Sequence, residues 1–144
     1  MTFGAFGGRA DIMAHFDPSA GGVLTQAGTF NNNIVTMTAA RAAVSQLLDD
    51  ERLEEVNRRG DELRRSLNGV FADRDPRMWV TGRGSMLTVH AEDDRLLELY
   101  FHAMLTAGHY LARRGFIALS FEIDDSHCAR LVSDTERWVQ TISD

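Results

Sequence analysis

The chain has 144 residues, the length of one ordinary domain, and its 44% of apolar residues is enough to form a core. A formal net charge of −6 excludes a general electrostatic attraction to nucleic acid or to an anionic membrane. No apolar run reaches the roughly 20 residues of a membrane span, and the N-terminus lacks the pattern of a secretion signal, so we expect a cytoplasmic protein.

The first part of the chain, residues 1–33, is rich in glycine and is predicted to consist mainly of loops. It has room for one short helix near residues 11–16, which Asp17 and Pro18 would end. Asn31 to Asn33 then offer N-cap side chains for a helix over about 34–48, where apolar residues recur at helical spacing.

The rest of the chain alternates helical and strand patterns. Acidic residues that precede arginines by four positions support a second helix over about 51–72. Further along, the patterns predict strands at 78–80 and 86–90 around a turn at 81–84, a helix at 94–113, a strand at 116–121, and a helix capped by 124–126 and running to about 142. This order predicts an α+β fold with helices packed on a small, mainly antiparallel sheet.

Gly28 and Thr29 are the pair with the clearest functional pattern. Glycine permits a close backbone approach, and threonine adds a hydroxyl and an amide shortly before a predicted helix N-terminus. Together they can bind a phosphate group. The same residues are also ordinary in a turn that binds nothing, and the spacing alone does not choose between the two.

Arg113 and Arg114 stand between a predicted helix and a predicted strand. As cations at a helix C-terminus they would complement the helix dipole. As a substrate site, either guanidinium could hold a carboxylate through two parallel hydrogen bonds. The histidines predict no metal site, because His102 and His109 have no carboxylate or cysteine at ligand spacing.

Two segments of the lead carry a family resemblance. Residues 4–13 read GAFGGRADIM and residues 26–33 read QAGTFNNN. They resemble the class III aminotransferases, which depend on pyridoxal 5′-phosphate (PLP), and in particular the branch of glutamate-1-semialdehyde aminomutase and β-phenylalanine aminotransferase. A weaker resemblance continues through 82–87 and 108–120, although only residues 91–93 stand where many relatives have a longer loop.

The resemblance implies an architecture. Residues 1–48 would be the tail of the large PLP-binding domain, and residues 49–144 the C-terminal small domain of a type I PLP-dependent, aspartate-aminotransferase-like fold. In the family the pair matching Gly28 and Thr29 lies at the interface of a homodimer and contacts the PLP phosphate of the neighbouring subunit. Arg113 or Arg114, with Arg114 preferred, would hold the carboxylate of an amino-acid or keto-acid substrate.

The catalytic lysine of such an enzyme is not in this chain, because all fifteen basic residues are arginine. The resemblance implies that the lysine stands roughly half a dozen residues before Met1, which would then be an internal start or a trimmed edge. We therefore assign no catalytic residue. Three hypotheses stay open: a C-terminal fragment that is inactive alone, one chain of a split enzyme completed in trans by a complementary N-terminal chain, and a non-catalytic interaction module. The choice between aminotransferase and aminomutase also stays open.

Overall fold

The computed structural model describes residues 3–29, 31 and 33–143. The chain separates into two compact units, Met1–Asp49 and Asp50–Asp144. Each unit is described by itself. Among the described residues, no helix is both long and apolar enough to cross a membrane.

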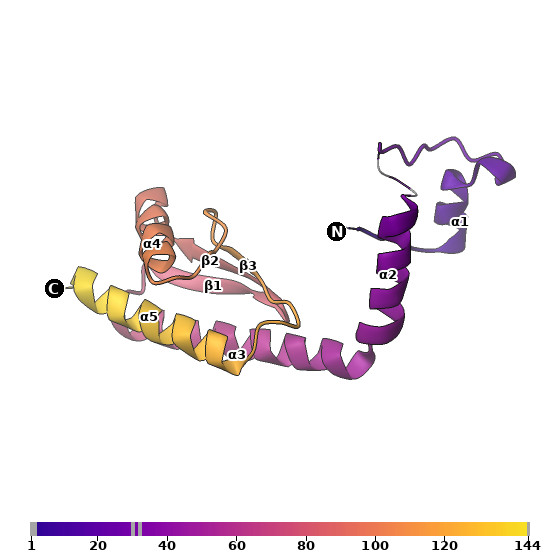
Figure 1. The fold of residues 1–144 in the computed structure, drawn as a ribbon. Helices are drawn as coiled ribbons and strands as arrows, with labels where there is room; N and C mark the ends of the chain where they lie inside the picture. The colour runs from indigo at the N-terminus through magenta and orange to yellow at the C-terminus, as the bar shows by residue number, and fades with distance from the viewer. Residues whose placement is uncertain (1–2, 30, 32, 144) are drawn as a thin grey trace. The chain divides into compact units, whose positions relative to one another are not determined.

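Unit 1 contains short helical turns and one longer helix (Figure 1). Helix α1, Ala10–Met13, continues into a 3-10 turn at Ala14–Phe16, and a second 3-10 turn follows at Pro18–Ala20. The Asp17 side chain accepts from the Ser19 amide at 2.8 Å and so caps this second turn. Helix α2, Ile34–Leu47, matches the predicted helix over 34–48.

Unit 2 is built on a three-stranded antiparallel sheet in the order β1-β2-β3. Strand β1, Met78–Arg83, and strand β2, Met86–Ala91, form a hairpin, and β2 pairs in turn with β3, Phe116–Ala118. The predicted turn at 81–84 is wrong by about two residues. Residues up to Arg83 continue β1, so the chain reverses at Gly84 and Ser85.

Helix α3, Asp50–Arg74, holds the hairpin through polar side chains. The carboxamide of Asn68 donates to the Val80 carbonyl at 2.9 Å and accepts from the Val80 amide at 2.8 Å, so it closes the outer edge of β1 as another strand would. At the hairpin turn, the side chains of Asn57 and Asp61 accept from the amides of Ser85 and Gly84. The helix is therefore fixed to the hairpin both in the middle of β1 and at the turn that follows it.

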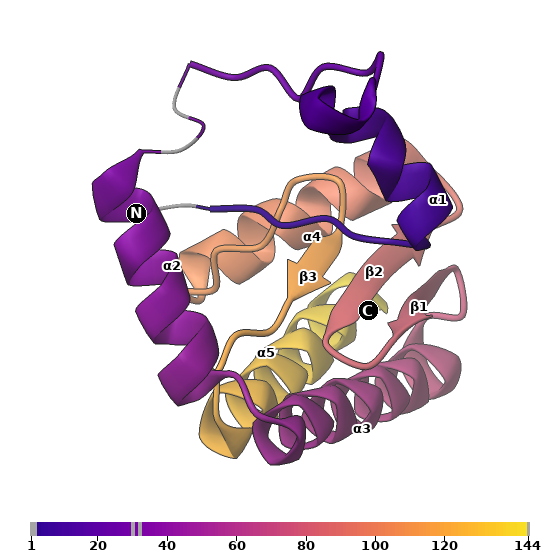
Figure 2. The ribbon, with the colours of Figure 1, turned by 90° about the vertical axis from the view of Figure 1, so that its right-hand side faces the viewer.

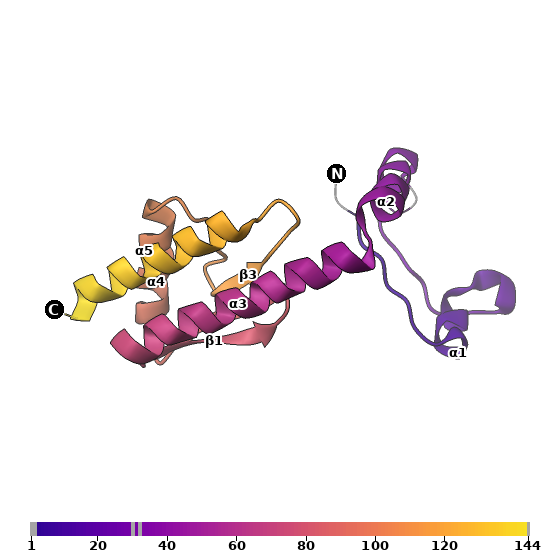
Figure 3. The ribbon, with the colours of Figure 1, turned by 90° about the horizontal axis from the view of Figure 1, so that it is seen from below.

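The core of unit 2 lies between the sheet and the helices. Helix α5, Asp125–Ser143, runs beside α3 on one side of the sheet, while α4, Asp94–Thr106, contacts α5 and β2 (Figures 1 and 3). Tyr100 joins these layers: its ring packs edge-on against Phe71 of α3 and Trp138 of α5. Its hydroxyl is 2.9 Å from that of the buried Thr135, and burial raises the pKa of Tyr100 to about 12.

Helix α4 ends seven residues before the predicted boundary at 113. Gly108 adopts a positive φ of 92°, which glycine tolerates without strain. The Gly108 amide donates to the Leu105 carbonyl, and the His109 amide donates to the Met104 carbonyl at 2.8 Å. This pair of bonds is a Schellman motif, in which a left-handed glycine ends a helix. A loop therefore separates Arg113 and Arg114 from the end of α4 at Thr106. Their interpretation as cations that complement the dipole at a helix end is wrong.

The α+β prediction is confirmed: helices pack on a small antiparallel sheet in unit 2 (Figure 2). The last helix begins where the sequence predicts, because the Asp124 side chain accepts from the His127 amide at 3.0 Å. Strand β3 is shorter than predicted and ends at Ala118 rather than 121.

Two glycines of α3 provide a matched test of this packing. A Cβ at Gly60 would lie 2.6 Å from the Gly84 carbonyl carbon and closer still to its oxygen, whereas a Cβ at Gly69 would meet nothing within 4 Å. We predict that G60A lowers the free energy of unfolding by about 1–3 kcal/mol. The control G69A should raise it by about 0.5–1 kcal/mol through helix propensity alone.

Urea denaturation followed by tryptophan fluorescence measures both variants, because Trp79 and Trp138 both lie in unit 2. Equal effects of G60A and G69A would contradict the close approach of α3 to the hairpin.

Candidate functional site

Gly28 and Thr29 lie in an exposed turn of unit 1. The Asn31 amide donates to the Gly28 carbonyl at 3.0 Å, and the Asn31 carboxamide donates to the Gln26 carbonyl at 3.1 Å. An added Cβ at Gly28 would lie 2.6 Å from the Asn31 side-chain oxygen. A side chain at position 28 would therefore displace the carboxamide of Asn31, a residue that the sequence suggested only as a helix cap.

The hydroxyl of Thr29 has no hydrogen-bond partner among the described residues, and the side chain is exposed. Phe30, the next residue in the sequence, lies outside the described residues. A free hydroxyl in a turn stabilised by Asn31 can donate to a phosphate oxygen, so the turn fits one edge of a phosphate group.

The first turn of α2 has its own cap. Asn33 accepts from the Thr36 amide at 3.0 Å, so its side chain satisfies one of the free amides of the helix N-terminus. A phosphate at Thr29 would therefore depend on the turn itself and on the remaining helix amides, not on the Thr36 amide.

Arg113 and Arg114 have different surroundings in unit 2. Two guanidinium nitrogens of Arg113 donate to the two carboxylate oxygens of Glu98 at 2.7 and 2.6 Å. Arg113 is the main cause of the lowered pKa of the Glu98 carboxyl, which also contacts His102 at 3.0 Å. The guanidinium of Arg114 lies 6.0 Å above the ring of Phe116, and no carboxylate of the described residues lies within ion-pair distance of it. Arg113 is therefore already paired with a carboxylate, whereas Arg114 is not.

The loop that carries these arginines is anchored to α5. His109 Nε2 lies 2.8 Å from Asp134 Oδ2, and both side chains are about nine-tenths buried. Arg137 donates to the other oxygen of Asp134 at 2.9 Å. His109 is the main cause, and Arg137 a further one, of a pKa of Asp134 below the usual range. The sequence excluded His109 from a metal site and gave it no partner.

Gly28 and Thr29 belong to unit 1, and Arg113 and Arg114 to unit 2. In unit 1, Asn31 folds back on the turn that carries Gly28 and Thr29. In unit 2, Glu98 binds Arg113. The described residues contain no group of three histidine, cysteine or acidic side chains arranged to hold a metal ion.

Comparison with known proteins identifies the lineage. No protein-family model matches the chain. A β-phenylalanine transaminase from Variovorax paradoxus is 40% identical over 146 residues, which cover 92% of this chain and 33% of that enzyme. A glutamate-1-semialdehyde 2,1-aminomutase from Methanothermobacter thermautotrophicus is 34% identical over 124 residues, 77% of this chain and 29% of that enzyme.

A solved structure of a β-phenylalanine aminotransferase from Variovorax paradoxus superposes with a TM-score of 0.80 and 35% identity, over 94% of this chain and 34% of that one. The chain belongs to the class III aminotransferase family. It corresponds to the C-terminal part of these relatives and spans about a third of their length. This homology confirms the family predicted from the two segments of the lead.

The His109 and Asp134 pair predicts a pH dependence. The folded state lowers the pKa of Asp134. The pair therefore contributes its full stability above the ordinary aspartate pKa of about 3.9, and this stability is lost as the pH falls below that value and through the lowered pKa of the folded state. We predict that D134N is less stable than the wild type at pH 7 and loses less stability between pH 5 and pH 3.

Urea denaturation at several pH values measures this dependence. The control D73N makes the same charge change at an exposed position of α3 and should keep the wild-type dependence. Equal losses of unfolding free energy in D134N and the wild type on acidification would contradict a role of Asp134 in anchoring the loop.

Proposed function

We propose that this chain is the C-terminal portion of a PLP-dependent class III aminotransferase or aminomutase. Residues 1–48 act as the tail of the large domain, and residues 49–144 form the small domain. The observation that carries the proposal is the 40% identity to β-phenylalanine transaminase across 92% of the chain. The boundary agrees with the division into units at Asp49.

In this proposal Gly28 and Thr29 bind the phosphate of a PLP molecule held mainly by a neighbouring subunit of a dimer. The exposure of the turn supports the assignment, as do its glycine and the free hydroxyl of Thr29. Asn31 keeps the turn in shape through its bond to the Gln26 carbonyl. The chain would then contribute an edge of the cofactor site to its neighbour.

Arg114 is the proposed substrate-binding residue, ahead of Arg113. Its guanidinium is oriented by the Phe116 ring and has no carboxylate partner among the described residues, so it can hold a substrate carboxylate without first breaking an ion pair. Arg113 would have to leave Glu98, which it already binds through two nitrogens.

When bound, PLP supplies the carbonyl that accepts the amino group and the electron sink for the reaction. The proton transfers at the reacting carbon need the lysine, and this chain has none. We therefore propose that the 144 residues alone do not transaminate, and that they position phosphate and substrate carboxylate for a lysine on another segment.

A split enzyme is the second candidate, in which a complementary N-terminal chain supplies the lysine that this chain lacks. A lysine-containing N-terminal chain encoded immediately upstream would support it. Activity on mixing the two chains would distinguish it from a fragment that must be covalently joined.

The proposed cofactor contact is tested in a chimera in which this chain replaces the matching third of the Variovorax paradoxus transaminase. We predict that the chimera shows the absorbance of bound PLP, and that T29A weakens PLP binding by roughly tenfold or more, because a hydrogen bond to a charged group is lost. The control T25A, an exposed threonine of the same loop, should have no effect.

Equal PLP retention in T29A and T25A would contradict the assignment of Thr29. Titration of PLP into the 144-residue chain alone is the companion measurement. A covalent cofactor band there would contradict the proposed division of labour, because the N-terminus is the only primary amine in the chain.

The substrate contact is tested in the same chimera by R114Q and R113Q. We predict that R114Q raises the KM for the amino-acid substrate by about tenfold or more, and that R113Q has a smaller effect because Glu98 already holds that guanidinium. A larger KM effect in R113Q than in R114Q would reverse the assignment.

A further inference from the structure

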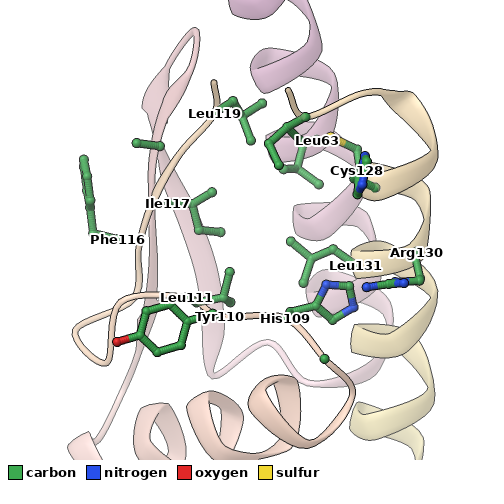
Figure 4. Close-up of a pocket in the computed structure, with 14 residues that line it drawn as sticks. Leu63, His109, Tyr110, Leu111, Phe116, Ile117, Leu119, Cys128, Arg130 and Leu131 are labelled. Atoms are coloured by element: carbon green, nitrogen blue, oxygen red, sulfur yellow. The ribbon is translucent and has the colours of Figure 1, made fainter. Parts of the chain in front are cut away.

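A cavity of about 250 Å³ opens between β3 and α5 in unit 2 (Figure 4). Ile117 and Leu119 line it from the sheet side, Leu131 from α5 and Leu63 from α3. Leu63, Ile117 and Leu131 belong to the core of unit 2, and Leu119 packs against it, so the cavity opens at the edge of this core. Its volume is just below the roughly 300–1,000 Å³ of most ligand pockets, which fits a molecule about the size of one substituted ring.

Besides the Tyr110 hydroxyl and the Cys128 thiol, the polar side chains that line this cavity are basic. His109, His127 and Arg130 line it, whereas its lining includes no aspartate or glutamate, although the chain carries a net charge of −6. Each histidine already has an acidic partner outside the lining: His109 has Asp134 at 2.8 Å, and His127 has Asp124 at 2.7 Å. The cavity therefore has basic groups without acidic groups of its own.

Arg130 is the cation that is left without a partner. No carboxylate of the described residues lies within ion-pair distance of its guanidinium. A Cβ added at Gly108 would lie 3.9 Å from Arg130 Nη2, so the guanidinium rests against the loop next to His109. Figure 4 shows His109 and Arg130 toward one end of the cavity and Leu119 and Leu63 toward the other. The Arg130 cation thus lies toward one end of the cavity, and the leucines Leu63 and Leu119 lie toward the other.

We propose that this cavity binds a small monocarboxylate with an aromatic or short aliphatic body. The body would occupy the space between Ile117 and Leu131, and the carboxylate would accept two hydrogen bonds from Arg130. Free phosphate would leave the apolar walls unmatched, and a neutral hydrocarbon would leave Arg130 unused. Arg113 and Arg114 line a different depression, with Asp94 and Glu98, so they are not part of this cavity.

Calorimetric titration of the 144-residue chain with benzoate, and with its neutral isostere benzamide, tests the proposal without PLP. We expect saturable benzoate binding, weaker benzamide binding, and a loss of benzoate affinity of about tenfold or more in R130Q. The control R95Q makes the same charge change on α4, outside the cavity lining, and should bind benzoate like the wild type.

Cys128 gives an independent readout of the same site. It is the only cysteine of the chain, its half-buried thiol lines the cavity, and burial raises its pKa. Benzoate should slow the alkylation of Cys128 by iodoacetamide in the wild type and in R95Q but not in R130Q. The proposal is overturned if benzoate does not bind saturably, if benzamide binds equally well, or if R130Q retains the affinity and the thiol protection of R95Q.

Discussion

The attachment of α3 to the hairpin is the contact on which the rest of unit 2 depends. Asn68 satisfies both main-chain groups of Val80, and Gly60 lets the helix approach the turn at Gly84. These contacts fix the sheet against one face of the helix, and α5 then packs beside α3 on the same side. Without them, the edge of β1 would expose unpaired main-chain groups, and α3 would no longer be held against the sheet to cover the core.

The two units differ in how much of their apolar surface they bury. Unit 2 has a continuous core that includes residues of every helix and strand it contains. In unit 1, helix α2 has one charged residue, Arg41, and apolar residues around its circumference, yet Ala40 is its only buried residue among those described. A helix that exposes several large apolar side chains is normally covered by other protein. This contrast agrees with a chain that spans about a third of its relatives, and with the proposal that unit 1 belongs to the large domain.

Local chemistry predicted the caps and element types well. The Asn33 cap, the Asp124 cap and the α+β class follow from side chains that act within three residues or from simple periodicity. The end of α4 was missed because apolar spacing continues through Leu111, whereas Gly108 stops the helix by a backbone conformation that periodicity does not encode. The partners of Arg113 and His109 were missed for a related reason. Glu98 and Asp134 lie 15 and 25 residues away, so only the folded chain brings them together.

The residues of the candidate site also fall into those that the local sequence predicts and those that only the folded chain reveals. Gly28 and Thr29 were found through a local motif, and the family assignment that depends on it is confirmed by homology. The preference for Arg114 now has a physical reason, since Glu98 occupies Arg113 and Phe116 orients Arg114. Asn31 was found only in three dimensions, because its role in the turn depends on a carboxamide folding back onto Gly28 and Gln26.

The central claim is that this chain contributes a phosphate-binding edge to a cofactor whose lysine lies on another segment. The most direct measurement is the affinity for PLP of mixed dimers between the T29A chimera and a chimera whose catalytic lysine is replaced. We predict that mixing restores tight PLP binding, because the lysine of one subunit then meets the intact Thr29 of the other. A mixture that binds PLP no better than the T29A chimera alone would contradict the claim.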